Sequence, residues 1–254
     1  MNEAPVLSET RNDGVVLITL NRPAARNAID PALSAALQED LRRLDRDEEL
    51  RVAVLRGAGG DFCAGMDLHA FADATPEQAA ETLDPLVREP PTKPVIAAVE
   101  GYALGGGLEL ALACDLIVAA ADARLGLPEV KLALVPSGGG LLRLPRRIAL
   151  GVAAEMALTG APRPAEELDR LGLFARLVPA GRAVAAALEI AAAIAANDPG
   201  AVAAAKALVR AGSRPAEELW EVQDRACRRL NAAPAARAAV AAFTASRRRG
   251  GDAR

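Results

Sequence analysis

The sequence predicts an α/β core followed by a helical tail. Three observations carry this prediction: short apolar runs typical of buried strands, helical segments that follow several of them, and a change of composition near residue 198. Hydrophobic residues make up 52% of the 254 residues, which is ample for a core. Aromatic residues make up only 2%, so alanine and leucine must supply most of the packing.

Local signals mark the elements of the core. The apolar run Val15–Leu20 is typical of a strand and is halted by an Asn-Arg-Pro triplet. Asp30 followed by Pro31 is typical of a helix N-cap and first turn, and this helix is expected to reach about Asp45. Further buried strands are expected at Val52–Leu55, Val95–Val99 and Leu116–Ala119.

Two later regions differ from this rhythm. Residues 70–92 are polar, punctuated by proline and aperiodic, and we expect a mobile loop or short helix near a ligand. From Asp198 onward, after a Pro-Gly break, helical segments rich in alanine, arginine and glutamate run to the end. We therefore divide the chain into a core, residues 1–197, and a helical domain, residues 198–254.

Composition argues against several classes of function. A formal net charge of −3 argues against a general nucleic-acid surface, although Arg247–Arg249 is locally basic. No stretch resembles a membrane span or a signal peptide. His69 is the only histidine, and the three cysteines have no metal-ligand spacing, so no metal site is expected. A reduced, cytoplasmic protein is the simplest interpretation.

The most informative segment is the glycine-rich start of an apolar helical run. Gly105, Gly106 and Gly107 expose backbone N–H groups, and a helix N-terminus adds a partial positive charge that suits a developing oxyanion. Glu109 stands in the first turn, beside the place where the anion would form. Donors for an oxyanion next to a carboxylate indicate proton transfer adjacent to a carbonyl group.

A second cluster, residues 61–68, has the same character. Ala64 and Gly65 are small enough to let a ligand approach the main chain, so another N–H group could complete a two-donor hole. Glu129 follows shortly after Gly126 and supplies a second carboxylate. Two carboxylates on separate segments could divide acid and base roles between them.

Each of these residues also has a purely structural explanation when taken alone. Glu109 suits a helix N-terminus on electrostatic grounds, Glu129 could pair with Lys131, and the glycines could merely permit close packing. A phosphate-binding loop is not supported, because the glycine run lacks a Gly-Lys-Ser/Thr ending. A serine hydrolase is weakly supported, because the segment around Ser137 lacks the nucleophile-elbow pattern.

In their order and spacing these residues resemble the crotonase superfamily, and within it the enoyl-CoA hydratases. The resemblance covers most of residues 14–175 and runs through Leu20–Pro23, Asn27–Ala28, Phe62–Leu68, Pro94–Gly101, the glycine helix with Ala113–Asp115, Leu127–Glu129 and Leu142–Arg146. It implies a spiral of β-β-α units followed by a C-terminal helical domain. By the same resemblance, that domain would pack against neighbouring subunits in a homotrimer or a dimer of trimers.

The resemblance also implies a reaction. The substrate would be a 2-enoyl-CoA thioester of fatty acid β-oxidation, hydrated without a separate cofactor because the substrate itself carries coenzyme A. The N–H groups of Ala64 and Gly106 would hold the thioester oxygen, Glu109 would activate water, and Glu129 would protonate the α-carbon. The residues implied in substrate and CoA binding are Arg22, Ala24, Arg26, Ala64, Gly65, Met66, Asp67, Leu68, Gly105 and Gly106.

Two alternatives stay open. The first is another reaction of the superfamily, above all Δ3,Δ2-enoyl-CoA isomerisation, which needs one carboxylate and no bound water. The second is an acyl-CoA-binding protein without turnover. Ser137 keeps the second alternative open, because hydratases of the superfamily commonly have glycine at that position.

Overall fold

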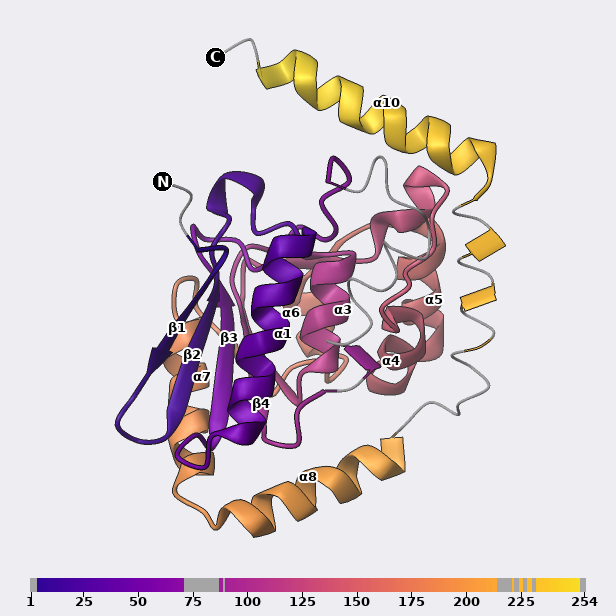
Figure 1. The fold of residues 1–254 in the computed structure, drawn as a ribbon. Coiled ribbons are helices and arrows are strands. Elements are labelled where there is room, and N and C mark those ends of the chain that lie inside the picture. The colour runs from indigo at the N-terminus through magenta and orange to yellow at the C-terminus, as the bar shows by residue number, and fades with distance from the viewer. Residues whose placement is uncertain are drawn as a thin grey trace.

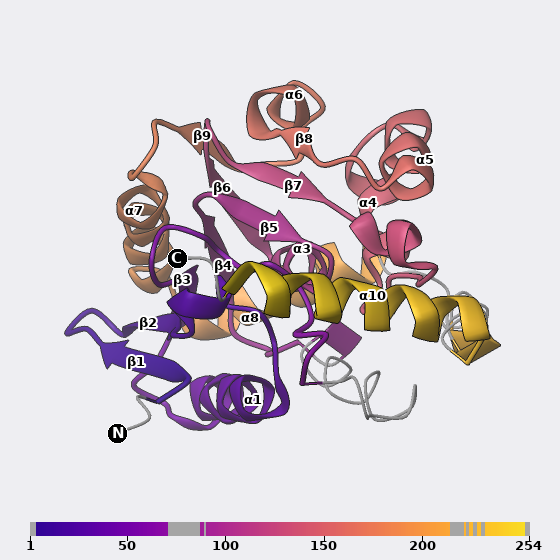
Figure 2. The same cartoon turned by 90° about the horizontal axis from the view of Figure 1, so that it is seen from above.

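The computed structural model describes residues 4–70, 87–88, 90–213, 221, 224–225, 228–229 and 232–251, and two sheets surrounded by helices form its centre (Figures 1 and 2). The larger sheet has the strand order β1-β2-β3-β4-β6-β9, and all its pairs are parallel except β1 with β2. Its strands are β1 (Val6–Thr10), β2 (Val15–Leu20), β3 (Val52–Gly57), β4 (Val95–Val99), β6 (Leu116–Ala120) and β9 (Arg176–Val178). The smaller sheet consists of β5 (Tyr102–Leu104), β7 (Arg124–Gly126) and β8 (Arg163–Pro164).

The chain alternates between the two sheets as it advances. β4 in the larger sheet leads into β5 in the smaller one, and helix α3 (Gly106–Ala113) then returns the chain to the larger sheet at β6. β6 leads in the same way into β7, which is followed by the 3-10 helix η2 and then α4 and α5. These three elements are η2 (Pro128–Leu132), α4 (Gly140–Arg147) and α5 (Leu150–Thr159). The β-β-α spiral predicted from the resemblance is therefore present.

Helices cover both faces of the larger sheet, with α1 (Pro31–Arg46) in front and α7 (Ala183–Ala195) behind in Figure 1. The side chains of β2 alternate between two cores, as the pleat requires. Val15 and Leu17 pack toward α7, whereas Val16 and Ile18 belong to the main core. α7 meets the sheet mainly through alanines, whose short side chains let the helix lie close to the strands.

The elements expected from local signals are confirmed. The strands Val15–Leu20 and Val95–Val99 have the predicted bounds, and the two others extend to Gly57 and Ala120. The Asp30 carboxylate caps α1 by accepting a hydrogen bond from the Leu33 N–H at 2.7 Å. Most of the predicted loop at residues 70–92, namely residues 71–86 and 89, lies outside the described residues, as does Cys227.

Two cations of helix α8 (Pro199–Ser213) anchor the start of the tail to the core. Lys206 Nζ and Arg210 Nε each lie 2.8 Å from an oxygen of Asp115, which follows α3. Arg210 also donates to the carbonyl of Ala113, at the end of α3 where the helix dipole favours positive charge. We call Asp115, Lys206 and Arg210 the tail latch.

The long helix α10 (Pro234–Gly251) lies further along the tail (Figure 1). Within the part of the chain that the structure describes, no helix is both long and apolar enough to cross a membrane. The domain boundary after residue 197 falls between α7 and α8 and stays a prediction.

Candidate active site

Helix α3 carries Glu109 into the interior of the protein. Gly105 turns the chain out of β5 with a φ of 53°, a conformation that glycine adopts without strain, and α3 begins at the next residue. A Cβ atom on Gly107 would lie 2.3 Å from the Cys63 carbonyl oxygen, so only glycine allows this close approach. All eight residues of α3 are buried, and Glu109 is 1% exposed.

A glycine loop before α4 holds the Glu109 carboxylate. The N–H of Gly140, the first residue of α4, donates to Glu109 Oε1 at 2.8 Å, and the Gly138 backbone also hydrogen-bonds to this carboxylate. Cβ atoms on Gly138 or Gly140 would come within 2.9 Å of Glu109 side-chain atoms. The two glycines therefore let the backbone surround the carboxylate, and the N-terminus of α4 favours its negative charge.

Glu129, on η2, faces the same place without comparable support. A Cβ atom on Gly105 would lie 3.0 Å from Glu129 Oε1, so the carboxyl group packs on the turn that starts α3. Glu129 Oε2 is inaccessible to solvent and has no hydrogen-bond partner among the described residues. Burial, with the negative charge of Glu109 as a second cause, raises the pKa of Glu129 to about 8.

The two carboxyl groups are thus close and unequal. Burial also raises the pKa of Glu109, but the backbone N–H donors and the Arg143 guanidinium oppose that rise. At Glu129 the only such opposing contribution is a hydrogen bond from its own backbone N–H, and Oε2 has no partner among the described residues. The two groups therefore titrate as one interacting pair, in which the backbone donors and Arg143 favour the ionised form of Glu109 and burial favours the protonated form of Glu129.

The N–H group of Gly106 lies at the start of α3. Gly106 is the first residue of α3, so its N–H has no helical carbonyl to bind. Gly65, with a φ of 99°, packs against this turn, where a Cβ atom on Gly65 would lie 3.5 Å from Gly106 N. The segment that contains residues 64–66 therefore borders the start of α3.

The expectation for Ala64 is wrong, because its N–H donates to the Arg26 carbonyl at 3.0 Å and is not free for a substrate oxygen. Met66 offers the alternative. The Gly65 carbonyl accepts from Ile29 N, and in a trans peptide the following N–H points the opposite way. The Met66 N–H thus points away from Ile29, and it has no hydrogen-bond partner among the described residues. Sequence spacing could not reveal which of these two groups is occupied.

The residues expected to bind coenzyme A divide into two groups. Arg22 lies 2.9 Å from Asp67 and 3.1 Å from Asp30, and it also donates to the Ala28 carbonyl. Its guanidinium therefore ties two loops together, and its expected contact with the CoA phosphates stays a prediction. Asp67 is likewise engaged, because its second oxygen accepts the His69 N–H at 3.1 Å.

The remaining members of that set lie at the surface or line the loop. Arg26 has a side chain that is 60% exposed, stands 3.6 Å from Asp61 and lies over the Tyr102 ring. Ala24 is exposed on the 3-10 helix η1 (Pro23–Ala25), and the side chains of Met66 and Leu68 are half-buried. Arg26 is therefore accessible to a ligand. His69, which follows Leu68, is also exposed.

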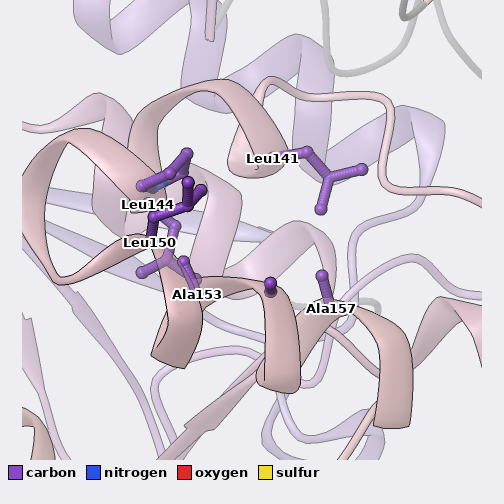
Figure 3. A pocket seen from close by; sticks show the side chains of 7 residues that line it. Leu141, Leu144, Leu150, Ala153 and Ala157 are labelled. Atoms are coloured by element: carbon purple, nitrogen blue, oxygen red, sulfur yellow. The ribbon is translucent and has the colours of Figure 1, made fainter.

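An apolar cavity of about 110 Å³ lies between α4 and α5 (Figure 3). Leucine, proline and alanine side chains line it, and neither carboxylate does. It is lined by Leu141, Leu144, Pro145, Leu150, Ala153, Ala154 and Ala157. Among the described residues, no three His, Cys, Asp or Glu side chains gather as metal ligands do.

The loop at residues 138–140 and Arg143 are site residues that sequence reasoning missed. The signal was present, because Gly138–Gly140 precedes a helical run in the same way as the glycines before α3. The sequence alone does not indicate that Glu109 contacts the glycines at the start of α4.

Comparisons with known proteins point to one family. Residues 10–246 match the enoyl-CoA hydratase/isomerase family. The chain is 41% identical over 202 residues to enoyl-CoA hydratase EchA19 of Mycobacterium tuberculosis, covering 76% of each chain. It is 43% identical over 221 residues to a carnitinyl-CoA dehydratase of Salmonella typhi, covering 82% of each. The crystal structure of enoyl-CoA hydratase EchA1 from Mycobacterium marinum superposes with a TM-score of 0.78 at 47% identity, covering 87% of this chain and 88% of that one.

Proposed function

The chain belongs to the enoyl-CoA hydratase/isomerase family, and from this premise we propose that it adds water across the double bond of a 2-enoyl-CoA thioester. The observation that carries the proposal is the unequal pair of buried carboxyl groups, Glu109 and Glu129. Hydration needs a base that takes a proton from water and an acid that gives one to the α-carbon. A pair whose surroundings separate the two roles supplies both near neutral pH.

In the proposed reaction, the thioester oxygen lies between the N–H groups of Gly106 and Met66. Glu109 removes a proton from a water molecule while the water oxygen bonds to the β-carbon. Negative charge then develops on the thioester oxygen. The two N–H groups stabilise this enolate, and loss of one such donor costs about 10²–10³ in rate in other enzymes. Glu129 then delivers its proton to the α-carbon, which completes the addition of water.

The direction of the reaction is part of the proposal. Similar proteins include one named as a hydratase and one named as a dehydratase, and these names describe opposite directions of the same chemistry. The same two carboxyl groups serve both directions with their roles exchanged. We propose the hydration of a 2-enoyl-CoA because the backbone donors and Arg143 favour the ionised form of Glu109, whereas burial favours the protonated form of Glu129.

The wider setting is also proposed. Coenzyme A enters as part of the substrate, with Arg26 at the surface and the main chain of Gly65–Leu68 along its path. We infer a homotrimer or a dimer of trimers in the cytoplasm, with a role in fatty acid β-oxidation. Exposed apolar side chains on α5 and α8, among them Leu158 and Leu208, support contact with other subunits. Light scattering at several concentrations tests the assembly.

Two isosteric variants test the mechanism against its main alternative. Hydration of crotonyl-CoA is expected to fall at least about 100-fold in both Glu109→Gln and Glu129→Gln, while acyl-CoA binding persists. An isomerase acting on a 3-enoyl-CoA would keep activity in Glu109→Gln and lose it in Glu129→Gln. If both variants retained full hydration activity, the two-carboxylate mechanism would be wrong. A non-catalytic binder would bind acyl-CoA without turning over either substrate.

A further inference from the structure

Arg143 is a half-buried cation placed behind the loop that holds Glu109. It lies on α4, one turn after Gly140, and its Nη1 donates to the Gly138 carbonyl at 3.0 Å. Its Nη2 donates to the carbonyl of Val87, which is itself fully buried. Arg143 therefore holds the opposite side of the peptide loop whose glycines surround the Glu109 carboxylate.

The charges around this site make Arg143 the cation that acts on Glu109. Glu109 faces Glu129 from η2 and Arg143 from α4, and Arg143 opposes the rise in the Glu109 pKa. Arg143 itself faces Arg147 on its own helix and Arg210 from α8, beside the buried Cys114 thiol. Burial, together with these like charges, lowers the pKa of Arg143 to about 10, so the guanidinium stays charged at neutral pH.

We propose that Arg143 is a positioning residue that, by binding the Gly138 carbonyl beside the Glu109 carboxylate, fixes both the orientation and the charge state of Glu109. This inference rests on the proposed function for its catalytic meaning. Its structural content is independent, because it concerns which of two adjacent carboxyl groups holds a proton. Removing the cation makes ionisation of Glu109 harder, so the active form appears only at higher pH.

Arg147 offers a matched control on the same helix. It is also a half-buried arginine of α4 that donates to backbone carbonyls, those of Leu112 and Cys114. Arg147 does not contribute to the Glu109 pKa shift, whereas Arg143 does. Arg143→Gln and Arg147→Gln each remove one cation from α4. Only the first variant removes a cation that acts on Glu109. Arg143→Lys keeps the positive charge but loses the paired guanidinium hydrogen bonds to the carbonyls of Gly138 and Val87.

The experiment has two readouts on the full chain. Difference infrared spectroscopy follows the carboxyl C=O stretch of Glu109 and Glu129 against pH, with Glu109→Gln and Glu129→Gln used to assign the bands. The pH dependence of kcat/KM for crotonyl-CoA is measured in parallel. In Arg143→Gln we expect the Glu109 midpoint and the acidic limb of the profile to rise together by about one pH unit. Arg143→Lys should restore most of that shift, and Arg147→Gln should leave both unchanged.

The experiment distinguishes failure of the proposed hydratase function from failure of the positioning role of Arg143. If the wild-type protein does not hydrate crotonyl-CoA, the proposed function fails while the infrared titration still reports on Arg143. If the Glu109 midpoint does not move in folded Arg143→Gln, or moves equally in Arg147→Gln, the positioning role is overturned. If Arg143→Gln does not fold, Arg143→Met removes the same charge with a side chain of similar length, and an unshifted Glu109 midpoint and acidic limb in that variant would overturn the role as well.

Discussion

At the scale of single residues, the site depends on backbone groups that glycine leaves accessible. Glu109 is buried inside helix α3 and accepts the Gly140 N–H, while Glu129 rests on the Gly105 turn. A side chain at either glycine would displace the carboxyl group it touches. Glycine thus serves two purposes here, because it turns the chain and brings main-chain donors within reach of an anion.

The substitution Gly140→Ala tests this arrangement. Its Cβ would lie 2.9 Å from Glu109 Cγ and 3.1 Å from Oε1, so the carboxylate must move away from the Gly140 N–H. We expect kcat to fall by at least about tenfold with a smaller change in KM, because positioned proton transfer contributes about 10²–10⁴-fold. Gly151→Ala in α5 is the control, since nothing lies within 4 Å of its Cβ position. Equal kcat values in the two variants would contradict the account.

A second prediction concerns the stability cost of Glu129. Its pKa is raised from 4.5 to about 8 by folding, so the folded state binds this proton more tightly than the unfolded state does. The resulting stabilisation is fully present below about pH 4.5 and is lost as the pH rises through about 8. Glu129→Gln, which is neutral throughout, should therefore have a higher Tm than the wild type at about pH 9 and little gain at about pH 4.

Calorimetry across this pH range measures the effect, with exposed Glu48→Gln as the control. A Tm difference for Glu129→Gln that stays constant with pH would show that Glu129 is not forced to ionise against its surroundings. The same would follow if Glu48→Gln gave the same pH dependence.

At the scale of elements, helix α3 joins the active site to the tail. Its first turn carries Gly106 and Glu109, and Asp115 follows its last residue by two positions. The tail latch binds there, with the Lys206 side chain only 8% exposed. One short buried helix therefore positions the chemistry at one end and fixes α8 at the other.

Removal of the latch carboxylate should destabilise the protein. Asp115→Asn leaves two cations near a buried site without their counter-ion, and breaking such a pair costs about 3–5 kcal/mol when fully buried. Because Arg210 is partly exposed, we expect a loss of about 2–4 kcal/mol in urea unfolding. Glu189→Gln breaks the exposed pair with Arg176 and should cost less than about 1 kcal/mol. Comparable losses in the two variants would mean that the latch contributes no more than a surface pair.

The sequence predicts some of these elements better than others. Val15–Leu20 and Val95–Val99 are buried on both faces, so each is a continuous apolar run that stands out without knowledge of the fold. The strands β5, β7 and β8 have two or three residues each and are set by pairing with distant segments. Such short strands have no periodic pattern of their own.

The candidate site follows the same division. Glu109, Glu129 and Gly106 can be predicted because each lies in a local motif with recognisable chemistry. Other features of the site depend on contacts between loops. The Ala64 N–H donates to the Arg26 carbonyl, and Arg22 forms ion pairs with Asp30 and Asp67. Hydrogen-bond partners of this kind are fixed by tertiary structure, and a single sequence does not reveal them.

At the scale of the whole molecule, the spiral brings three consecutive segments to one place. β5 and α3 supply Gly106 and Glu109, the next turn supplies Glu129 on η2, and the start of α4 returns to hold Glu109. In Figure 2, β5, α3 and α4 lie on the side of the smaller sheet. A fold that adds one strand to each sheet per turn therefore assembles an acid, a base and N–H donors from neighbouring repeats.

The most direct test of the central claim is to incubate the purified protein with crotonyl-CoA in ¹⁸O-labelled water and analyse the product by mass spectrometry. The account predicts a product heavier by one molecule of labelled water, formed as the conjugated enoyl-thioester absorbance disappears, and formation of that product at least about 100-fold more slowly with Glu109→Gln. Binding of crotonyl-CoA without turnover would contradict the account. So would a parallel incubation in which a 3-enoyl-CoA is converted to its conjugated isomer without incorporation of the label.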